Sequence, residues 1–230
     1  ANELYRCGAY VVSKLNSFDG QLEDKLTGVT GASQRIKRGI ELCLDAGFNK
    51  VSPSRMSLHT IITKYNFTEI PAIFRWERDH NIIPYIQLPV LTGRARSEMA
   101  ITNEQAYKLF YQLLQIDRDE YGYDWIPTPP NVGWNCTQRL NSCYITSIGD
   151  VQMCSGTSIV VGNIRQQGLR EILLSREMQN IRDLRQIKGK CAGCSFLETV
   201  CCAGCTGNNY STTGDVFSSD ERCWINGSKV

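Results

Sequence analysis

The stretch KCAGCSFLETVCCAGCTG, residues 190–207, places five cysteines within eighteen residues. The whole chain has eleven cysteines, and only Cys7 and Cys43 lie before residue 136. Thiols at this density form disulfides, bind zinc or hold an iron–sulfur cluster. The uneven distribution predicts a cysteine-ligated metal module joined to an ordinary globular half. The opening segment ANELYRCGAYVV shows no secretory signal, which argues against disulfides and predicts a cytoplasmic protein.

The spacing of the cysteines separates the two kinds of metal site. Cys191 and Cys194 form a C-x2-C pair, which presents two thiolates to one metal centre from a single tight turn. A four-iron cluster needs four converging thiolates, and eight cysteines would make two such sets. A zinc ribbon needs two C-x2-C pairs, whereas CCAGC offers either Cys202-x2-Cys205 or Cys201-x3-Cys205. Spacing therefore favours iron–sulfur binding and leaves a structural zinc protein as an alternative.

Composition excludes two classes of partner. The formal net charge is +2 and charged residues make up 21% of the chain, so the basic footprint of a nucleic-acid binder is absent. The sequence contains no run of about 18 apolar residues, and we therefore expect no membrane-spanning helix. The 42% hydrophobic content is sufficient for a buried core.

The first half alternates between strand and helix patterns. Such alternation predicts a parallel sheet with right-handed crossovers, and three units are too few to close a barrel. We therefore expect an α/β fold that forms part of a (β/α) barrel. Strands are predicted at 9–19, 55–64 and 82–91, and helices at 31–48, 66–81 and 102–121. The predicted helix caps are Gly47 at one C-terminus, Asn66 or Thr68 at the second N-terminus, and a Thr102–Gln105 capping box at the third.

Polar residues follow the predicted strands, where (β/α) barrels carry their chemistry. Lys14, Asn16 and Ser17 lie at the end of the first strand, and Gln87 lies near the end of the third. Polar residues are common wherever a strand meets a loop, so position alone makes these only candidates. Cys43 lies on an apolar helix face and is interpreted as a core residue, and His59 and His80 have no ligand-like spacing.

The second half begins after a Pro-rich segment, DWIPTPPNVGW at 124–134, which is typical of a linker or an ordered wrap. We predict a domain boundary there, with one domain at 1–125 and a small α+β cysteine-rich domain at 126–230. YITSIGDVQMC at 144–154 has the pattern of a β-hairpin that brings Cys143 and Cys154 together. The following segment, 161–183, predicts a turn and helix with Leu169, Ile172 and Leu173 on one face.

The cysteine pattern resembles the SPASM signature of radical S-adenosylmethionine (SAM) enzymes. Cys143 and Cys154 flank Gly149, and four residues lie between Gly149 and Cys154. The sequence continues with Cys191-x2-Cys194, then Cys201-x3-Cys205, and ends with Cys223. One departure is visible, because six residues rather than five lie between Cys194 and Cys201. VVSKLNSFD, GASQRIKRGIELCLDAGF and IPYIQLPVLTGRA also resemble, with less specificity, parts of the radical SAM partial barrel.

The resemblance implies two auxiliary 4Fe–4S clusters. The implied ligands are Cys143, Cys154 and Cys205 with Cys136 as the fourth for the first cluster, and Cys191, Cys194, Cys201 and Cys223 for the second. Cys202 is then a spare thiol. The resemblance also implies that Lys14, Asn16, Ser17 and Gln87 contact SAM or substrate.

The C-x3-C-x2-C motif with which radical SAM enzymes bind their SAM-cleaving cluster is missing. We therefore expect the chain to be the C-terminal part of a longer oxidoreductase or maturase, inactive alone, whose parent holds a third 4Fe–4S cluster. The resemblance implies a peptide, tetrapyrrole or small-molecule substrate and an electron donor such as flavodoxin or ferredoxin. A stand-alone iron–sulfur electron carrier is the remaining alternative.

Overall fold

The computed structural model describes residues 1–225, and this part of the chain divides into two compact units. The first unit contains Ala1–Pro89, Glu98–Pro127 and Asn131–Gly133. The second contains Val90–Ser97, Thr128–Pro130 and the chain from Trp134 onward. Each unit has its own sheet and its own apolar core. The two units are described separately below.

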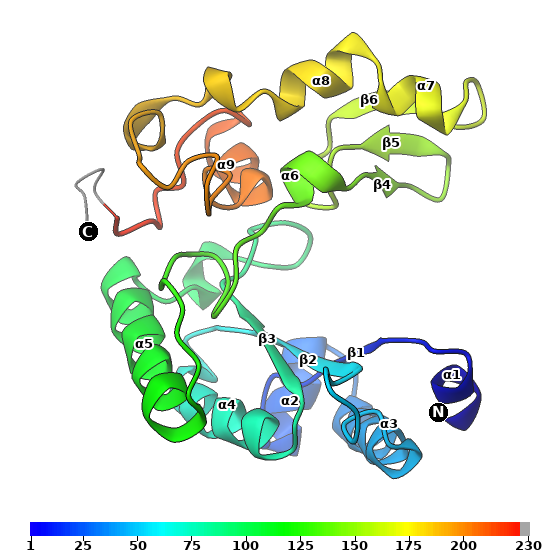
Figure 1. The fold of residues 1–230 in the computed structure, drawn as a ribbon, viewed down its shortest axis with the longest axis vertical. Helices are drawn as coiled ribbons and strands as arrows, with labels where there is room; N and C mark the ends of the chain where they lie inside the picture. The colour runs from blue at the N-terminus through cyan, green and yellow to red at the C-terminus, as the bar shows by residue number, and fades with distance from the viewer. Residues whose placement is uncertain (226–230) are drawn as a thin grey trace. The chain divides into compact units, whose positions relative to one another are not determined.

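The first unit is built on a three-stranded parallel sheet in the order β1-β2-β3 (Figure 1). This sheet confirms the predicted parallel α/β fold. Its strands are β1 Val11–Lys14, β2 Met56–Ile61 and β3 Ile83–Gln87. The helices are α1 Asn2–Arg6, α2 Gly20–Thr27, α3 Ala32–Ala46, α4 Ile70–Asp79 and α5 Asn103–Ile116. The short helix α2 was not predicted from the sequence.

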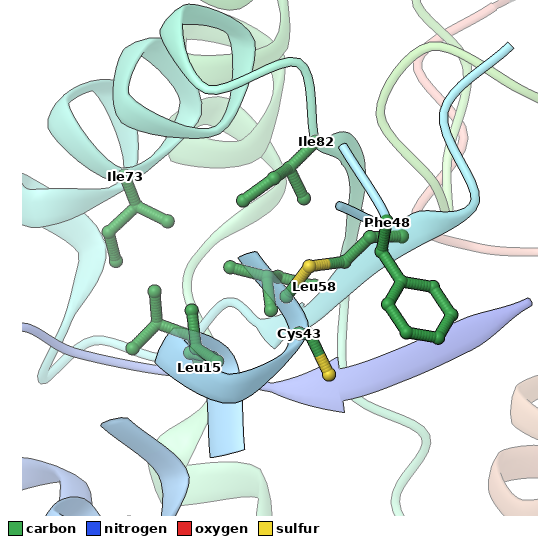
Figure 2. Packing of buried hydrophobic residues seen from close by; sticks show 8 residues of the cluster. Leu15, Cys43, Phe48, Leu58, Ile73 and Ile82 are labelled. Carbon is green, nitrogen blue, oxygen red and sulfur yellow. The ribbon is translucent and has the colours of Figure 1, made fainter. Parts of the chain in front are cut away.

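One face of this sheet packs against helices and the other does not. Leu58 of β2 and Ile73 of α4 are fully buried, and Cys43 of α3 lies in the same cluster at 9% exposure (Figure 2). Cys43 is thus a core residue, as its helical spacing predicted. On the opposite face Val12 is 51% exposed and lacks such cover. The two faces arise because successive side chains along a strand point in opposite directions.

The helix ends follow local sequence signals in two of three cases. Gly47 ends α3 in the left-handed conformation, at φ 90°. Thr102 and Gln105 form the predicted capping box of α5. The N-cap predicted for the remaining helix is met in position only: Asn66 is the N-cap of the 3₁₀ turn Phe67–Glu69 that runs into α4, but no side chain caps that turn or α4. Asn66 instead closes the preceding turn, where its Oδ1 accepts from the Thr63 backbone at 2.7 Å.

Glu77 of α4 is a buried carboxylate and supplies a stability test. It is 0% exposed, and neither carboxylate oxygen has a hydrogen-bond partner in the described residues. Burial raises its pKa well above the ordinary value, although the adjacent Arg78 acts in the opposite direction. The folded chain therefore binds a proton at Glu77 that the unfolded chain has lost, and stability falls as pH rises above about 4.3.

We expect Glu77→Met to raise the free energy of unfolding at pH 7 by about 1–3 kcal/mol, because it removes this unpaired group. Below about pH 4 the gain should shrink, since Glu77 is then protonated in both states and only the cost of its unpaired neutral carboxyl group remains. Urea denaturation across this range measures the difference. Glu41→Met, on an exposed face of α3, is the control and should leave the pH dependence of the unfolding free energy unchanged. If the free energy of unfolding depended on pH equally in the wild type and in Glu77→Met, the raised pKa of Glu77 would be contradicted.

The second unit is built on a small antiparallel sheet, in the order β4-β5-β6. The hairpin of β4 and β5 was predicted, and Gly149 turns it at φ 91°. Val151 and Met153 pack against Ile172 in the core of this unit. The elements are α6 Gln138–Asn141, β4 Tyr144–Ile145, β5 Asp150–Gln152, β6 Val160–Asn163, α7 Leu169–Leu173, α8 Arg176–Arg182 and α9 Thr206–Thr213. Much of the remaining backbone in this unit is irregular.

Short single turns complete the described chain: the 3₁₀ segments Phe67–Glu69, Ser97–Met99, Leu184–Gln186 and Gly189–Cys191, and the π-helical turn Asp117–Tyr121. The π-helical turn extends α5, and Asp117 within it accepts two hydrogen bonds from Arg78. Across residues 1–225, no helix has both the length and the apolar character that crossing a bilayer requires.

Candidate metal centre

Four cysteines of the second unit surround one pocket. Cys191 and Cys194 contribute from the C-x2-C turn, Cys201 from the following loop, and Cys223 from the C-terminal segment. Phe196, Leu197 and Ile225 are among the other residues that line the pocket. These are the four cysteines that the family resemblance assigned to one cluster. The structure brings them together, while metal binding itself stays a prediction.

Hydrogen bonds attach the C-terminal segment to the C-x2-C turn. Ser219 Oγ accepts from the Cys191 backbone at 3.0 Å and donates to the Lys188 carbonyl at 2.6 Å. Lys190 Nζ donates to the Cys223 carbonyl at 2.8 Å. Cys223 is thereby held at the same pocket as Cys191, although 31 residues separate them in the sequence.

The loop after Cys201 folds back on its sulfur. Ala203 and Gly204 both have positive φ, 66° and 71°, and successive left-handed residues turn their backbone N–H groups toward one point. The Gly204 N–H donates to Cys201 Sγ at 3.3 Å. Burial raises the pKa of the Cys201 thiol, whereas these backbone donors lower it. Donors of this kind favour a thiolate, the form that binds a metal.

Cys136, Cys154 and Cys205 form a second group of neighbouring cysteines. The pKa of Cys136 is raised to about 11, chiefly by burial, with smaller contributions from the nearby Cys205, Cys154 and Cys202. Burial also raises the pKa of Cys154, with Cys205 again adding to it. Cys143 packs against the apolar cluster that contains Cys154. Thiols with raised pKa values keep their protons at neutral pH, so metal binding here must displace protons.

Cys201 and Cys202 are adjacent in the sequence but lie beside different groups of cysteines. Cys201 lines the pocket of the C-x2-C turn, whereas Cys202 is buried and lies near Cys136. The sequence left both residues as candidates to pair with Cys205 in CCAGC. The structure therefore favours Cys201 over Cys202 for the second set.

Two glycines bring Cys154 and Cys205 into one group. Gly156 and Gly207 cross so closely that a Cβ added to Gly156 would lie 2.8 Å from the Gly207 Cα atom. Each glycine is two residues beyond its cysteine. Any larger side chain at the crossing would force the two backbones apart.

A buried ion pair supports the backbone at Cys205, the N-cap residue of α9. Asp220 is 0% exposed, and its Oδ2 accepts from the Cys205 backbone at 3.0 Å. Arg222 donates to both carboxylate oxygens of Asp220. Burial raises the pKa of Asp220, but Arg222 outweighs it and the pKa lies below its ordinary value. Asp220 is therefore ionised at neutral pH.

We expect Asp220→Asn to destabilise the chain by about 1–3 kcal/mol at pH 7, because it removes the charged partner of Arg222, whose side chain is only 16% exposed. Guanidinium-induced unfolding of the metal-free chain measures the loss. Asp183→Asn, whose Arg185 partner is 85% exposed, is the control and should cost less than about 1 kcal/mol. A similar small loss in both variants would show that Arg222 finds another partner.

Within residues 1–225, no three His, Cys, Asp or Glu side chains converge closely enough to hold a single metal ion. The thiolates around one zinc ion all lie within about 2.3 Å of it. Each thiolate of a four-iron cluster instead binds a different iron, so its sulfurs are spread more widely. The four cysteines that line the pocket match the number of thiolates that such a cluster needs.

In the first unit, the structure divides the predicted SAM or substrate contacts into two pairs. Lys14 and Gln87 end β1 and β3 on the face of the sheet without helices. Asn16 and Ser17 are 7% and 3% exposed, and their side chains bind Glu23 and Glu69. The geometry therefore favours Lys14 and Gln87 as ligand contacts over Asn16 and Ser17.

His59 lies beside Lys14 on that face, and sequence reasoning missed it. Lys14 Nζ is 2.8 Å from His59 Nδ1, and Tyr85 stacks on the His59 ring at 4.1 Å. Burial, and then Lys14, lower the pKa of His59 to about 4, so the ring is neutral and can accept from Lys14. The alternation of β2, which puts Met56 and Leu58 on the helix side, was the signal that could have shown His59 on the open face.

Comparison with protein families gives one match, at residues 136–195, to the SPASM iron–sulfur cluster-binding domain. Curated relatives include an "AdoMet-dependent heme synthase" of Methanosarcina barkeri, 25% identical over 243 residues, which cover 90% of this chain. A protein of the same name from Nitratidesulfovibrio vulgaris is 25% identical over 89% of this chain. The chain spans 66% and 62% of the lengths of these two relatives.

Two solved structures share the fold. Streptococcus suis SuiB bound to S-adenosylmethionine has a TM-score of 0.61 at 17% identity, over 93% of this chain and 53% of its own. The native anSMEcpe structure with bound AdoMet and the Cp18Cys peptide has a TM-score of 0.58 at 10% identity, over 91% of this chain and 63% of its own. At these identities the likeness establishes the fold alone.

The family match changes which cysteine is assigned to the first position of the signature. The match begins at Cys136. The signature of the family that the sequence resembles opens as C-x(9–15)-G-x4-C. Twelve residues separate Cys136 from Gly149, whereas only five separate Cys143 from it. Cys136 therefore fits the first position of the signature, and Cys143 becomes the candidate for the fourth ligand. The match at residues 136–195 and the AdoMet-dependent names of the relatives support the resemblance to radical SAM proteins that carry a SPASM domain, and the solved structures show that the fold is shared.

Proposed function

We propose that the second unit binds two 4Fe–4S clusters that carry single electrons in a radical SAM reaction. The observation that carries this proposal is the separation of the cysteines into two groups, one of which surrounds a single pocket. The proposed ligands are Cys136, Cys143, Cys154 and Cys205 for the first cluster, and Cys191, Cys194, Cys201 and Cys223 for the second.

The protein's own residues prepare these sites in two ways. They bury or half-bury the cysteines, which limits access of water, and they direct backbone N–H groups at Cys201 and Cys205. Both burial and hydrogen bonds to sulfur set the reduction potential of an iron–sulfur cluster. When bound, the clusters would accept or donate one electron at a time.

For the first unit, we propose that the open face of the sheet contacts SAM or substrate through Lys14 and Gln87. Cleavage of SAM would use a third 4Fe–4S cluster bound by a C-x3-C-x2-C motif that these 230 residues do not contain. The names of the 25%-identical relatives favour a tetrapyrrole substrate over a peptide or another small molecule. We propose an oxidoreductase or maturase reaction in the cytoplasm, with flavodoxin or ferredoxin as the electron donor.

The test is anaerobic reconstitution of the chain with iron and sulfide, followed by iron and zinc quantification and Mössbauer spectroscopy. We expect about eight irons per chain in the 4Fe–4S form. About four irons per chain would mean that only one of the two proposed sites binds a cluster. Zinc without iron would contradict the proposal and favour a structural zinc protein.

A further inference from the structure

Arg139 of α6 is a buried cation whose contacts are all uncharged. Its residue is 2% exposed, in the same unit as the cysteine groups. The guanidinium donates to the carbonyls of Val216 and Ile181 at 2.8 and 2.7 Å, and to Thr206 Oγ1 at 3.4 Å. It also lies 5.2 Å from the centre of the Phe217 ring. These contacts solvate the charge without neutralising it.

The carboxylates that face Arg139 already have cations of their own. Asp215 pairs with Lys188 at 2.7 Å, and Asp183 pairs with Arg185 at 2.8 Å. In the described part of the chain, Arg139 itself makes no salt bridge. The remaining charged or chargeable groups that face it are the thiols of Cys202 and Cys154, which exceed both carboxylates in their effect on its pKa.

A buried guanidinium without a negative partner destabilises the folded chain, and arginine stays protonated and charged in proteins. The paired carboxylates do not supply the missing negative charge, and in the described residues the Nε atom of Arg139 has no hydrogen-bond partner. A 4Fe–4S cluster bound by four thiolates would supply this negative charge. In the oxidised state, the four thiolates carry two more negative charges than the iron–sulfur core carries positive charges. Reduction adds a further negative charge at the same place.

We propose that Arg139 is the built-in counter-ion of the first cluster, the one assigned to Cys136, Cys143, Cys154 and Cys205, and that it raises the reduction potential of this cluster. The inference rests on the proposed function, because it needs a cluster at this site. A fixed cation favours the more negative, reduced state, and burial strengthens the effect because little water screens it. Arg222 is a poorer candidate, since Asp220 already neutralises it.

The experiment is a redox titration followed by electron paramagnetic resonance. It compares the reconstituted wild type with Arg139→Met, which removes the charge, and Arg139→Lys, which keeps it. Arg176→Met, at an exposed arginine of α8, is the matched control. Repeating the set in a Cys191→Ser/Cys194→Ser background isolates the first cluster. Iron is counted in every sample.

We expect Arg139→Met to lower the midpoint of the first cluster by at least a tenfold change in its reduction equilibrium, which is about 59 mV for one electron. Arg139→Lys should restore most of the wild-type value, and Arg176→Met should match it. Unchanged midpoints with about eight irons retained would overturn the inference. Loss of iron in Arg139→Met alone would support a charge requirement, whereas equal loss in Arg139→Lys would show a structural role and overturn it. A wild type without iron would instead refute the proposed function.

Discussion

Replacing Cys191 and Cys194 together with serine is expected to halve the iron content of the reconstituted chain, from about eight to about four per chain. Both residues line the pocket that Cys201 and Cys223 share. A serine hydroxyl keeps its proton at neutral pH and is a poor iron ligand, so two sulfurs cannot hold the cube. The group of Cys136, Cys154 and Cys205 lies outside this pocket, and its cluster should survive.

Iron and sulfide quantification with Mössbauer spectroscopy measures this outcome. Two single variants are the controls: Cys7→Ser, at an exposed thiol of the first unit, and Cys202→Ser, at the spare thiol. Both should retain about eight irons. Complete loss of iron in the double variant would show that the two sites depend on each other. Full retention would show that the C-x2-C turn holds no cluster.

The sequence predicted the candidate site better than it predicted the surroundings of that site. Cysteine spacing is a property of the sequence itself, so the group around Cys191 and Cys194 could be read directly. The close crossing of Gly156 and Gly207 could not, because 50 residues separate these glycines and nothing local marks them as neighbours. The same holds for Asp220, whose support of the Cys205 backbone depends on the fold of the C-terminal segment.

The helices show the same division between local and distant causes. The capping box of α5 and the C-terminal glycine of α3 are local signals, and both were predicted. α9 was missed because TGNNYSTT is rich in residues that disfavour helix interiors. Asn208 and Asn209 of α9 are nonetheless 5% and 0% exposed, and Asn209 donates to two distant carbonyls. Tertiary contacts rather than helix propensity therefore stabilise α9.

Gly156→Ala is expected to remove the first cluster while the second remains. The added Cβ would lie 2.8 Å from the Gly207 Cα atom, a distance that only a backbone shift can relieve. That shift would separate Cys154 from Cys205 and lower the stability of the metal-free chain by about 1–3 kcal/mol. Because it changes no sulfur, the variant tests whether the glycine crossing is what brings these ligands together.

Iron counting and denaturant unfolding measure the two effects of Gly156→Ala separately. Gly168→Ala is the matched control, since Gly168 has a negative φ and no atom within 4 Å of an added Cβ. It should keep about eight irons and near wild-type stability. About four irons in Gly156→Ala, with the signal of the second cluster intact, would show that the two cluster sites fold independently around their own backbone contacts. Wild-type iron content and stability would mean that the crossing is looser than the structure shows, and that Cys154 and Cys205 meet for another reason.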